Sequence, residues 1–557
     1  MDRVPIYRAP VRNRGKQELG RDMMKAELFA ATILVGSTIA TAPAALADAP
    51  GATPVVETEA GKVQGLEDDG VDAYLGIRYA SPPVGDLRFQ PPIPADEWQG
   101  IADATGHGAP CMQLYTPSGP NTTELTRQIQ GIFPTGTEEK IDNEDCLFLN
   151  VWTPDASSGS RPVMVWFHGG GYAYGSGSWP AYDGRNLAEK GDVVVVTVNH
   201  RLNAFGYLNL AEAFGDEFDA SGNVGNLDLV RSLEWVRDNI ANFGGDPNNV
   251  TIMGESGGGS KVSHLMAMPL ADGLFHKAIV QSGPGVTSGK PEEAAEYAAK
   301  ILEAAGIETV EQLQAYPAED LLLAVRRATP AGSGFGRGPS LGPIADGTIL
   351  PRDPFLPAAP EQSRDVPLMI GYNKDEMTLF LASQPWFGRI DDAQLDGMAA
   401  MMGDGAKEAV AAYRAMYPDY SPTHIASAAM GGRFVRGTYI LADQQSRTAE
   451  APVYVYRLTW ETPVAGGLLK SPHTLDIPLM FDNAEESAAL VGTGEDAATM
   501  AEMMSDAWIA FAKTGTPSSA LLPEWTPYTA DSRMVMELDV EPRMVDDPEA
   551  SIRTIGQ

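Results

Sequence analysis

A serine between glycines lies where the chain changes from a strand-like to a helix-like segment. The motif Gly-Glu-Ser-Gly-Gly at 254–258 follows the short apolar run 250–253 and precedes a helix-compatible stretch through Met268. Glycines on both sides of Ser256 let the backbone turn tightly enough to lift the hydroxyl out of a sheet, and the N–H groups that begin the following helix point at the same place. This context predicts a nucleophile elbow, with Ser256 as the nucleophile.

A serine hydroxyl is a poor nucleophile at neutral pH and needs a histidine base that a carboxylate orients. In folds with this elbow the chain order is serine, acid, histidine, and each group follows a strand of the sheet. The strand-like run 367–371 leads into a loop with two adjacent carboxyl groups, Asp375 and Glu376, which the spacing alone does not separate. His473 follows the strand-like run 453–460 and is the predicted base.

Two other histidines downstream of Ser256 are poorer candidates for the base. His424 stands beside a proline in a helix-rich segment. His264 lies further along the helix that begins at the elbow, so its side chain cannot easily swing back to the hydroxyl. We therefore expect His264 to be structural.

A run of three glycines offers backbone donors for the oxyanion of an acyl-transfer intermediate. These glycines, 169–171, come after His168, directly behind the strand-like run 163–167. Because glycine has no Cβ to shield its N–H group, these donors and the N–H group of Gly257 are predicted to hold the developing negative charge.

The elements that must position these groups are strands alternating with helices. The strand-like runs are 146–152, 163–167, 193–198, 250–253, 278–282, 367–371 and 453–460. Apolar residues recur at helical spacing over 227–243, and the segments 291–331 and 390–430 look like helical insertions. The continuous β-branched run 193–198 suits a strand buried on both faces. The pattern predicts an α/β fold with a large, mostly parallel sheet covered by helices on both faces.

Composition and charge exclude several classes of partner. The chain has 557 residues, 43% of them apolar, and a formal net charge of −34. Such a charge would repel nucleic-acid phosphates and anionic membrane surfaces, so a nucleic-acid partner is not expected. From Pro54 onward there is no internal repeat and no second apolar stretch long enough to cross a bilayer, and one globular body is the simplest account. The sequence does not indicate an oligomeric state.

The N-terminal region resembles an export signal. Residues 28–47 are apolar and uncharged, follow the positive flank of Lys25 and end in a small-x-small pattern before Asp48. Met24 could be the true start, which would leave residues 1–23 as an upstream extension. We therefore expect an extension plus signal peptide over 1–47, a single enzyme domain over 48–557, and a periplasmic or secreted protein without an integral membrane segment after cleavage. The alternative is an uncleaved anchor.

Cys111 and Cys146 are the two cysteines of the chain. An even pair in an exported protein indicates one disulfide, here across 35 positions, and two unpaired buried thiols are the alternative.

Several blocks together resemble the type-B carboxylesterases, the α/β-hydrolase family that includes cholinesterases and bacterial para-nitrobenzyl esterases. The resemblance spans roughly 54–528. Its blocks are Tyr-Leu-Gly-Ile-Arg-Tyr-Ala at 74–80, Pro-Pro-Val-Gly at 82–85, Leu-Arg-Phe at 87–89, Glu-Asp-Cys-Leu-Phe-Leu-Asn at 144–150, Val-Asn-His-Arg-Leu at 198–202 and Asn-Phe-Gly-Gly-Asp-Pro at 242–247.

The resemblance implies an α/β-hydrolase fold and hydrolysis of small-molecule carboxylic esters through an acyl-enzyme. It implies Ser256 as nucleophile, Glu376 rather than Asp375 as acid, and His473 as base. No metal or organic cofactor is implied, and the sequence shows no cluster with zinc-ligand spacing.

The same resemblance assigns supporting residues. Gly170, Gly171 and Gly257 would donate to the oxyanion, and Ser282 matches a family serine that hydrogen-bonds the acid. A plain serine at a strand end is the alternative for Ser282. The family also pairs the cysteines that match those of this chain.

Two departures from the family pattern stand out. Gly257 replaces the alanine that usually follows the nucleophile, and the cysteine loop 111–146 lacks the tryptophan on which cholinesterases rest a quaternary ammonium. Choline recognition is therefore not expected, although Tyr115 and Phe133 could substitute. Aromatic residues that could line an access gorge are Trp179, Tyr182, Phe335, Trp386 and Phe387.

Other activities are compatible with the same scaffold. A lipase acting at oil interfaces and an amidase are the nearest alternatives. A non-catalytic binding protein is the alternative from another class, because a fold does not imply an activity.

Overall fold

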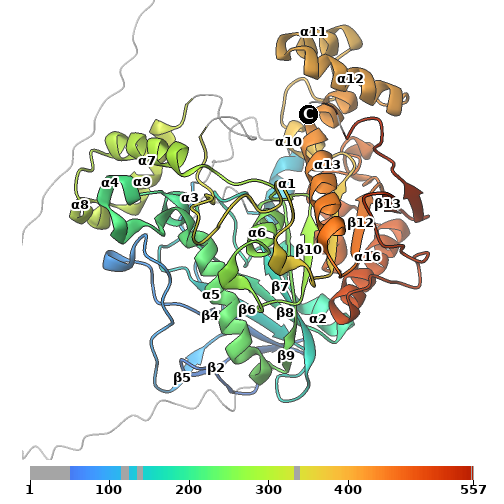
Figure 1. Ribbon diagram of the computed structural model, residues 1–557. Coiled ribbons are helices and arrows are strands. Elements are labelled where there is room, and N and C mark those ends of the chain that lie inside the picture. Colours follow the sequence, from blue (N-terminus) through green and yellow to red (C-terminus); the bar gives the residue numbers. More distant parts are fainter. Residues whose placement is uncertain (1–50, 115–123, 135–141, 331–338, 554, 556–557) are drawn as a thin grey trace, which may run out of the picture. The chain divides into compact units, whose positions relative to one another are not determined.

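An eleven-stranded sheet runs through the described part of the chain, with helices on both faces (Figure 1). The structure is a computed structural model that describes residues 51–114, 124–134, 142–330, 339–553 and 555. The predicted signal segment, Tyr115 and Phe335 lie outside the described residues.

The inner strands of this sheet are parallel, as the sequence predicts. In spatial order they are β8 (Val194–Val198), β7 (Arg161–Phe167), β9 (Gly245–Glu255), β10 (Lys277–Gln281), β11 (Leu368–Asn373), β12 (Val453–Leu458) and β13 (Met534–Leu538). Antiparallel strands complete the two edges: β14 (Arg543–Asp546) beside β13, and β6 (Phe148–Thr153), β4 (Val71–Arg78) and β3 (Leu66–Asp68) beyond β8. A small separate sheet holds β1 (Val56–Glu57), β2 (Lys62–Gln64) and β5 (Ile101–Asp103).

Alternate side chains of the inner strands enter two different cores. Along β7, Val163 and Val165 face one core, whereas Met164 and Trp166 face the other, and all four are fully buried. Both cores are apolar, which explains why the inner strands read as continuous apolar runs. Each fully buried side chain of this kind contributes about 1.5 to 3 kcal/mol to folding.

Each core is closed by its own set of helices. The first contains residues of α5 (Val224–Asn239), α6 (Gly257–Leu265) and α13 (Pro422–Thr448). The second contains residues of α2 (Arg185–Gly191), α14 (Asp476–Met480) and α16 (Glu495–Thr514). The predicted α/β fold with a mostly parallel sheet is therefore confirmed.

Helices also fill the two predicted insertions. The first holds α7 (Pro291–Ala305), α8 (Val310–Ala315) and α9 (Ala318–Ala328), and the second begins with α11 (Asp392–Met402) and α12 (Asp404–Met416) and runs into α13. The remaining α-helices of the described residues are α1 (Glu124–Ile132), α3 (Asn203–Tyr207), α4 (Ala211–Phe214), α10 (Met377–Leu381) and α15 (Ala488–Val491). None of the described helices is both long enough and apolar enough to cross a membrane.

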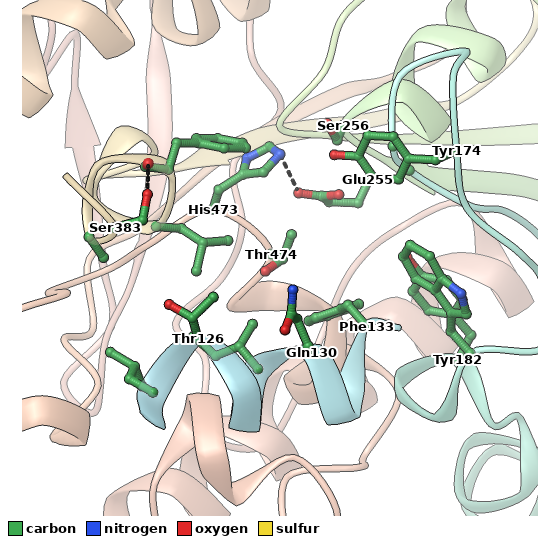
Figure 2. Close-up of a pocket in the computed structure, with 18 residues that line it drawn as sticks. Thr126, Gln130, Phe133, Tyr174, Tyr182, Glu255, Ser256, Ser383, His473 and Thr474 are labelled. Atoms are coloured by element: carbon green, nitrogen blue, oxygen red, sulfur yellow. Dashed lines mark hydrogen bonds and ion pairs between the residues drawn. The ribbon is translucent and has the colours of Figure 1, made fainter. Parts of the chain in front are cut away.

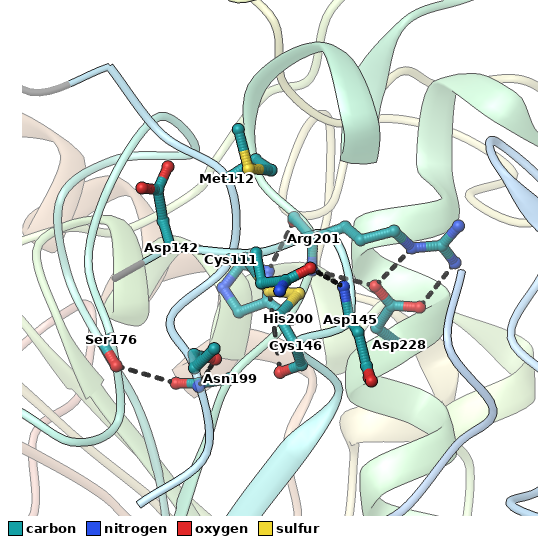
Figure 3. Close-up of a disulfide and its surroundings, with 12 residues drawn as sticks. Cys111, Met112, Asp142, Asp145, Cys146, Ser176, Asn199, His200, Arg201 and Asp228 are labelled. Carbon is teal, nitrogen blue, oxygen red and sulfur yellow. Dashed lines mark hydrogen bonds and ion pairs between the residues drawn. A yellow bond between two sulfur atoms is a disulfide. The ribbon is translucent and has the colours of Figure 1, made fainter. Parts of the chain in front are cut away.

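A disulfide joins Cys111 to Cys146 across 35 positions, with a Cα–Cα distance of 4.9 Å (Figure 3). Both cysteines are buried, and a buried ion pair between Arg201 Nη2 and Asp228 Oδ1 at 2.6 Å lies nearby. The bridge therefore anchors the segment that precedes α1 to the start of β6.

Candidate active site

The carboxyl ends of the parallel strands bring four loops to one edge of the sheet. β9 ends immediately before Ser256, β7 ends immediately before His168, and the loops after β11 and β12 carry Glu376 and His473. In open α/β sheets this edge is where ligands bind, because every strand delivers its following loop there.

Ser256 sits at a strained turn between β9 and α6. Its φ of 57° and ψ of −121° lie in a region that residues with a Cβ rarely adopt, which typically costs about 1 to 3 kcal/mol. Two backbone hydrogen bonds hold the turn: Ser256 N–H donates to Gln281 at 2.8 Å, and Ser260 N–H donates to the Ser256 carbonyl at 3.1 Å. The neighbouring glycine is required sterically, since a Cβ on Gly258 would lie 2.0 Å from the carbonyl oxygen of Phe167.

The imidazole of His473 is held on one side by Glu376. The distance from Nδ1 to Glu376 Oε2 is 2.5 Å, and the backbone N–H of Asn373 donates to Glu376 Oε1 at 2.9 Å. The ring lies between Phe380 and Phe434, with centroid distances of 5.0 and 5.2 Å. These contacts fix the ring plane, and the N–H of Nδ1 donates to the Glu376 carboxylate.

The other ring nitrogen meets the residue before the serine. Nε2 of His473 lies 3.1 Å from Oε1 of Glu255 (Figure 2). Between the described side chains of Ser256 and His473 the structure records no hydrogen bond, although both line one cavity. Catalytic hydrogen bonds of unliganded enzymes are often loose and tighten when substrate binds.

The charges around His473 change its proton affinity. Burial lowers the pKa of this imidazole, but the carboxylates of Glu255 and Glu376 outweigh burial and raise the pKa from 6.5 to about 9. Burial raises the pKa of Glu255 well above its ordinary value. The two groups titrate together, so the proton affinity of each depends on the charge of the other.

The structure distinguishes the two adjacent carboxyl groups that the sequence leaves open. Asp375 has no recorded contact with the imidazole among the described residues, and its Oδ2 accepts from the backbone N–H of Ser471 at 3.4 Å. Burial raises the pKa of Asp375 to about 6, against the lowering effect of Lys374. Glu376 is the carboxyl group that contacts His473.

A buried polar layer supports the loop that carries His473. Asp476 accepts hydrogen bonds from Gln281 Nε2 at 2.8 Å, Tyr456 Oη at 2.9 Å and Asn373 Nδ2 at 3.1 Å. These partners come from β10, β12 and β11, so one carboxylate joins three neighbouring strands. Sequence reasoning missed Asp476, because nothing local distinguishes it from a helix-capping aspartate.

The glycine loop after β7 packs against the start of α6. Gly170 and Gly171 have φ of 80° and 61°, and the Gly170 carbonyl accepts from Ala173 N–H at 3.2 Å and Tyr174 N–H at 3.3 Å. A Cβ on Gly257 would lie 2.5 Å from the backbone nitrogen of Gly171. The three predicted oxyanion donors are therefore neighbours beside Ser256.

The expected hydrogen bond from Ser282 to the acid is absent. The Ser282 hydroxyl is buried and has no hydrogen-bond partner among the described residues, while its backbone N–H donates to Gly371 at 2.8 Å. The recorded partners of Glu376 are instead His473, at Oε2, and the backbone N–H of Asn373, at Oε1. This correction leaves the alternative of a plain strand-end serine.

Ser256 and His473 open into a cavity of about 280 Å³ whose walls are largely apolar (Figure 2). Its lining residues away from the catalytic groups include Leu125 and Ile129 of α1, Phe133 directly after this helix, and Trp179, Tyr182, Leu379 and Phe380. Of the predicted gorge aromatics, Trp179 and Tyr182 line this cavity, whereas Trp386 and Phe387 pack beside α10 instead. Sequence reasoning missed most of the α1 wall, because its apolar face is visible in the sequence but its docking place is not.

The two histidines that the sequence made poorer candidates for the base have structural partners. His264 is buried, and its Nδ1 donates to the Ser260 carbonyl at 2.6 Å. His424 Nε2 donates to the Leu468 carbonyl at 2.9 Å. Neither histidine lines the cavity beside Ser256.

Comparison with known proteins places the chain in a family. Residues 52–552 match the model of the carboxylesterase family. The para-nitrobenzyl esterase of Bacillus subtilis (strain 168) is 38% identical over 507 residues, which cover 90% of this chain and 97% of that protein. The fumonisin B1 esterase of Sphingopyxis macrogoltabida is 34% identical, with 90% and 88% covered.

Solved structures agree with the sequence comparison. A carboxylesterase of Geobacillus stearothermophilus superposes with a TM-score of 0.76 at 37% identity, covering 90% of this chain and all of that one. A thermophilic para-nitrobenzyl esterase gives a TM-score of 0.73 at 35% identity, covering 90% of this chain and 99% of that one. The chain therefore belongs to the carboxylesterase family and is a carboxylic ester hydrolase of the type-B, para-nitrobenzyl esterase-like kind.

Proposed function

We propose that this carboxylesterase is an exported serine esterase that hydrolyses uncharged esters through Ser256, His473 and Glu376. The observation that carries this proposal is the buried imidazole of His473, which Glu376 holds at 2.5 Å beside the cavity that Ser256 also lines. A nucleophile, a base and an orienting acid on separate loops at one sheet edge are what acyl transfer requires.

The reaction runs in two halves. In the first, Ser256 Oγ attacks the ester carbonyl as its proton passes to Nε2 of His473, and the N–H groups of Gly170, Gly171 and Gly257 hold the oxyanion. The imidazolium then gives the proton to the leaving alkoxide, which departs as the alcohol. In the second half, water attacks the acyl-enzyme with His473 as base, and the acid product leaves as Ser256 regains its proton.

The cavity favours uncharged substrates. Its walls are largely aliphatic and aromatic, and the carboxyl groups near the serine would repel a substrate that carries its own carboxylate. A series of p-nitrophenyl esters of increasing acyl length, assayed on the mature protein, would define how much of the cavity the acyl group fills.

Replacement of the nucleophile tests the proposal. Ser256→Ala is expected to abolish hydrolysis of p-nitrophenyl butyrate while the melting temperature stays within a few degrees of the wild type. Ser260→Ala, a serine on the same helix, is the matched control and should retain most activity. Turnover by Ser256→Ala at the wild-type rate would refute the assignment.

The export part of the proposal is tested separately. N-terminal sequencing of the protein recovered outside the cytoplasm is expected to start near Asp48. A mature chain that still carries Leu34 would contradict cleavage at the predicted site.

A further inference from the structure

Lys261 is a buried cation that the catalytic mechanism above does not use. It lies on α6, one turn beyond the elbow, and its side chain is fully buried. No ion pair joins its ammonium to a carboxylate of the described residues, and burial lowers the pKa of its amine well below the ordinary value. Burying an amine without a counter-charge is unfavourable, so its presence calls for a specific contact.

That contact is with the glycine loop. Nζ of Lys261 donates to the backbone carbonyl of His168 at 2.7 Å. The ring of Tyr172 lies near the amine, with its centroid 5.7 Å from Nζ. The imidazoles of His168 and His200 stack on each other at 4.9 Å, and burial and the charge of Lys261 lower the pKa of both well below the ordinary value. Lys261 therefore reaches across from α6 to the first peptide of the loop.

The carbonyl groups of this loop decide where its N–H groups point. In a planar trans peptide the C=O and N–H bonds point in opposite directions, so a hydrogen bond that holds the carbonyl also aims the N–H of the next residue. The Gly169 carbonyl accepts from His168 Nδ1 at 2.9 Å, which aims the N–H of Gly170. The Gly170 carbonyl accepts from the N–H groups of Ala173 and Tyr174, which aims the N–H of the following glycine.

Lys261 holds the one peptide that comes before these two. Its bond to the His168 carbonyl fixes the peptide between His168 and Gly169, from which the donor-bearing peptides continue. On the other side, the loop rests directly on the first turn of α6, since a Cβ on Gly257 or Gly258 would overlap the backbone of Gly171 or Phe167. The glycines at the start of α6 therefore let the loop pack closely, and the Lys261 amine, one turn further along the helix, holds the loop by a hydrogen bond.

We propose that Lys261 is a positioning residue of the oxyanion hole, which acts by holding the His168 carbonyl and so the direction of the loop N–H groups. This inference rests on the proposed assignment of Ser256 and the loop glycines. Its consequence is that Lys261 stabilises the tetrahedral intermediate more than the bound ester, because the ester carbonyl does not yet carry the negative charge that the donors hold.

The test compares ligands that do and do not form the oxyanion. An alkyl trifluoromethyl ketone accepts Ser256 Oγ at its carbonyl carbon, the serine proton moves to His473, and the ketone oxygen becomes an oxyanion. The corresponding trifluoromethyl alcohol fills the same cavity and cannot form this adduct. In Lys261→Met, the inhibition constant of the ketone is expected to rise about 10- to 50-fold and that of the alcohol to stay within about twofold.

Kinetics and stability give two further readouts. In Lys261→Met, kcat for p-nitrophenyl butyrate should fall about 10- to 50-fold with KM nearly unchanged. The melting temperature should stay level or rise, because the variant no longer buries an unpaired amine. Val262→Ala is the matched control: it is fully buried on the same helix, should lower the melting temperature and should leave the ketone-to-alcohol affinity ratio unchanged.

The outcomes separate this inference from the proposed function. A wild-type ketone-to-alcohol ratio in Lys261→Met would overturn the role of Lys261, as would a loss of activity that only follows a loss of stability. Lys261→Leu is the second variant if Lys261→Met does not fold, with the same expectation. If the wild-type protein forms no ketone adduct at Ser256, the catalytic assignment fails, and the inference fails with it.

Discussion

The two sides of the catalytic cavity present different chemical groups, backbone N–H groups on one side and buried carboxyl groups on the other. On one side, the loop after β7 and the start of α6 present backbone N–H groups, and a Cβ on Gly257 or Gly258 would lie 2.0 to 2.5 Å from the backbone of that loop or of the end of β7. On the other side, His473 is surrounded by the buried carboxyl groups of Glu255, Glu376 and Asp476. Added side-chain volume should lower kcat on the first side, and removal of a charge should lower kcat on the second.

The largest effect is expected on the charged side. Glu376→Gln keeps the shape of the acid but no longer stabilises the imidazolium, and it should lower kcat about 10³- to 10⁴-fold, as measured with p-nitrophenyl butyrate per titrated active site. Asp375→Asn is the matched control, because this neighbouring carboxyl group is also buried and its recorded backbone partner is Ser471, not His473.

The pair of variants also decides between adjacent acids. Asp375→Asn should keep kcat within about tenfold of the wild type, since it removes no group that contacts the imidazole. A larger loss in Asp375→Asn than in Glu376→Gln would reverse their roles and break the account of the charged side.

On the side of the backbone N–H groups, one added methyl group should be enough to lower kcat. Gly257→Ala places a Cβ 2.3 Å from the carbonyl oxygen of Gly171, so the glycine loop must move away and kcat should fall about 10- to 100-fold with little change in KM. The inhibition constant of the trifluoromethyl ketone, which also tests Lys261, should rise in Gly257→Ala if the glycine loop has moved.

The control for added volume is a glycine in open space. Gly405→Ala lies in α12, where a Cβ would meet nothing within 4 Å, and it should leave kcat unchanged while stabilising the helix by up to about 1 kcal/mol. Because related enzymes usually carry alanine after the nucleophile, full activity of Gly257→Ala would mean that the loop lies further from α6 than this structure has it.

The backbone side could be predicted almost entirely from the sequence. Strand, turn and helix around Ser256 are adjacent in the chain, and the three glycines follow a strand directly, so their geometry is set locally. Strands β6 to β12 were predicted for the same reason, as continuous apolar runs. The strands β3, β4, β13 and β14, at or next to the sheet edges, were not predicted, because polar residues such as Asp72 interrupt their apolar pattern.

The charged side could be predicted only in part. The order serine, acid, histidine led to Glu376 and His473, but the contact of Glu255 with the imidazole, the bridging by Asp476 and the orphaned hydroxyl of Ser282 depend on how distant strand ends meet. Lys261 escaped notice for a similar reason. Its partner is the backbone carbonyl of His168, and because every residue has a backbone carbonyl, no residue type in the sequence marks this partner.

The smallest effect is a shift in pH dependence. Glu255 raises the pKa of His473, and the base is active only when neutral, so the acid limb of kcat/KM in the wild type should lie above the ordinary histidine value of 6.5 and no higher than about 9. Glu255→Gln removes that charge and lowers the pKa of His473, so the acid limb of the kcat/KM profile should move to lower pH. The maximum value of kcat/KM should fall a few-fold, because the imidazolium is less stabilised. A limb that moves to higher pH would contradict the contact at 3.1 Å.

The most direct test of the central claim is the site and rate of covalent labelling. A p-nitrophenyl alkylphosphonate should transfer one phosphonyl group per chain to Ser256, as identified by peptide mass spectrometry, with release of one p-nitrophenolate. In His473→Ala the labelling rate should fall at least about 10³-fold, since the serine then lacks its base. Labelling of a different residue, or an unchanged rate in His473→Ala, would contradict the account.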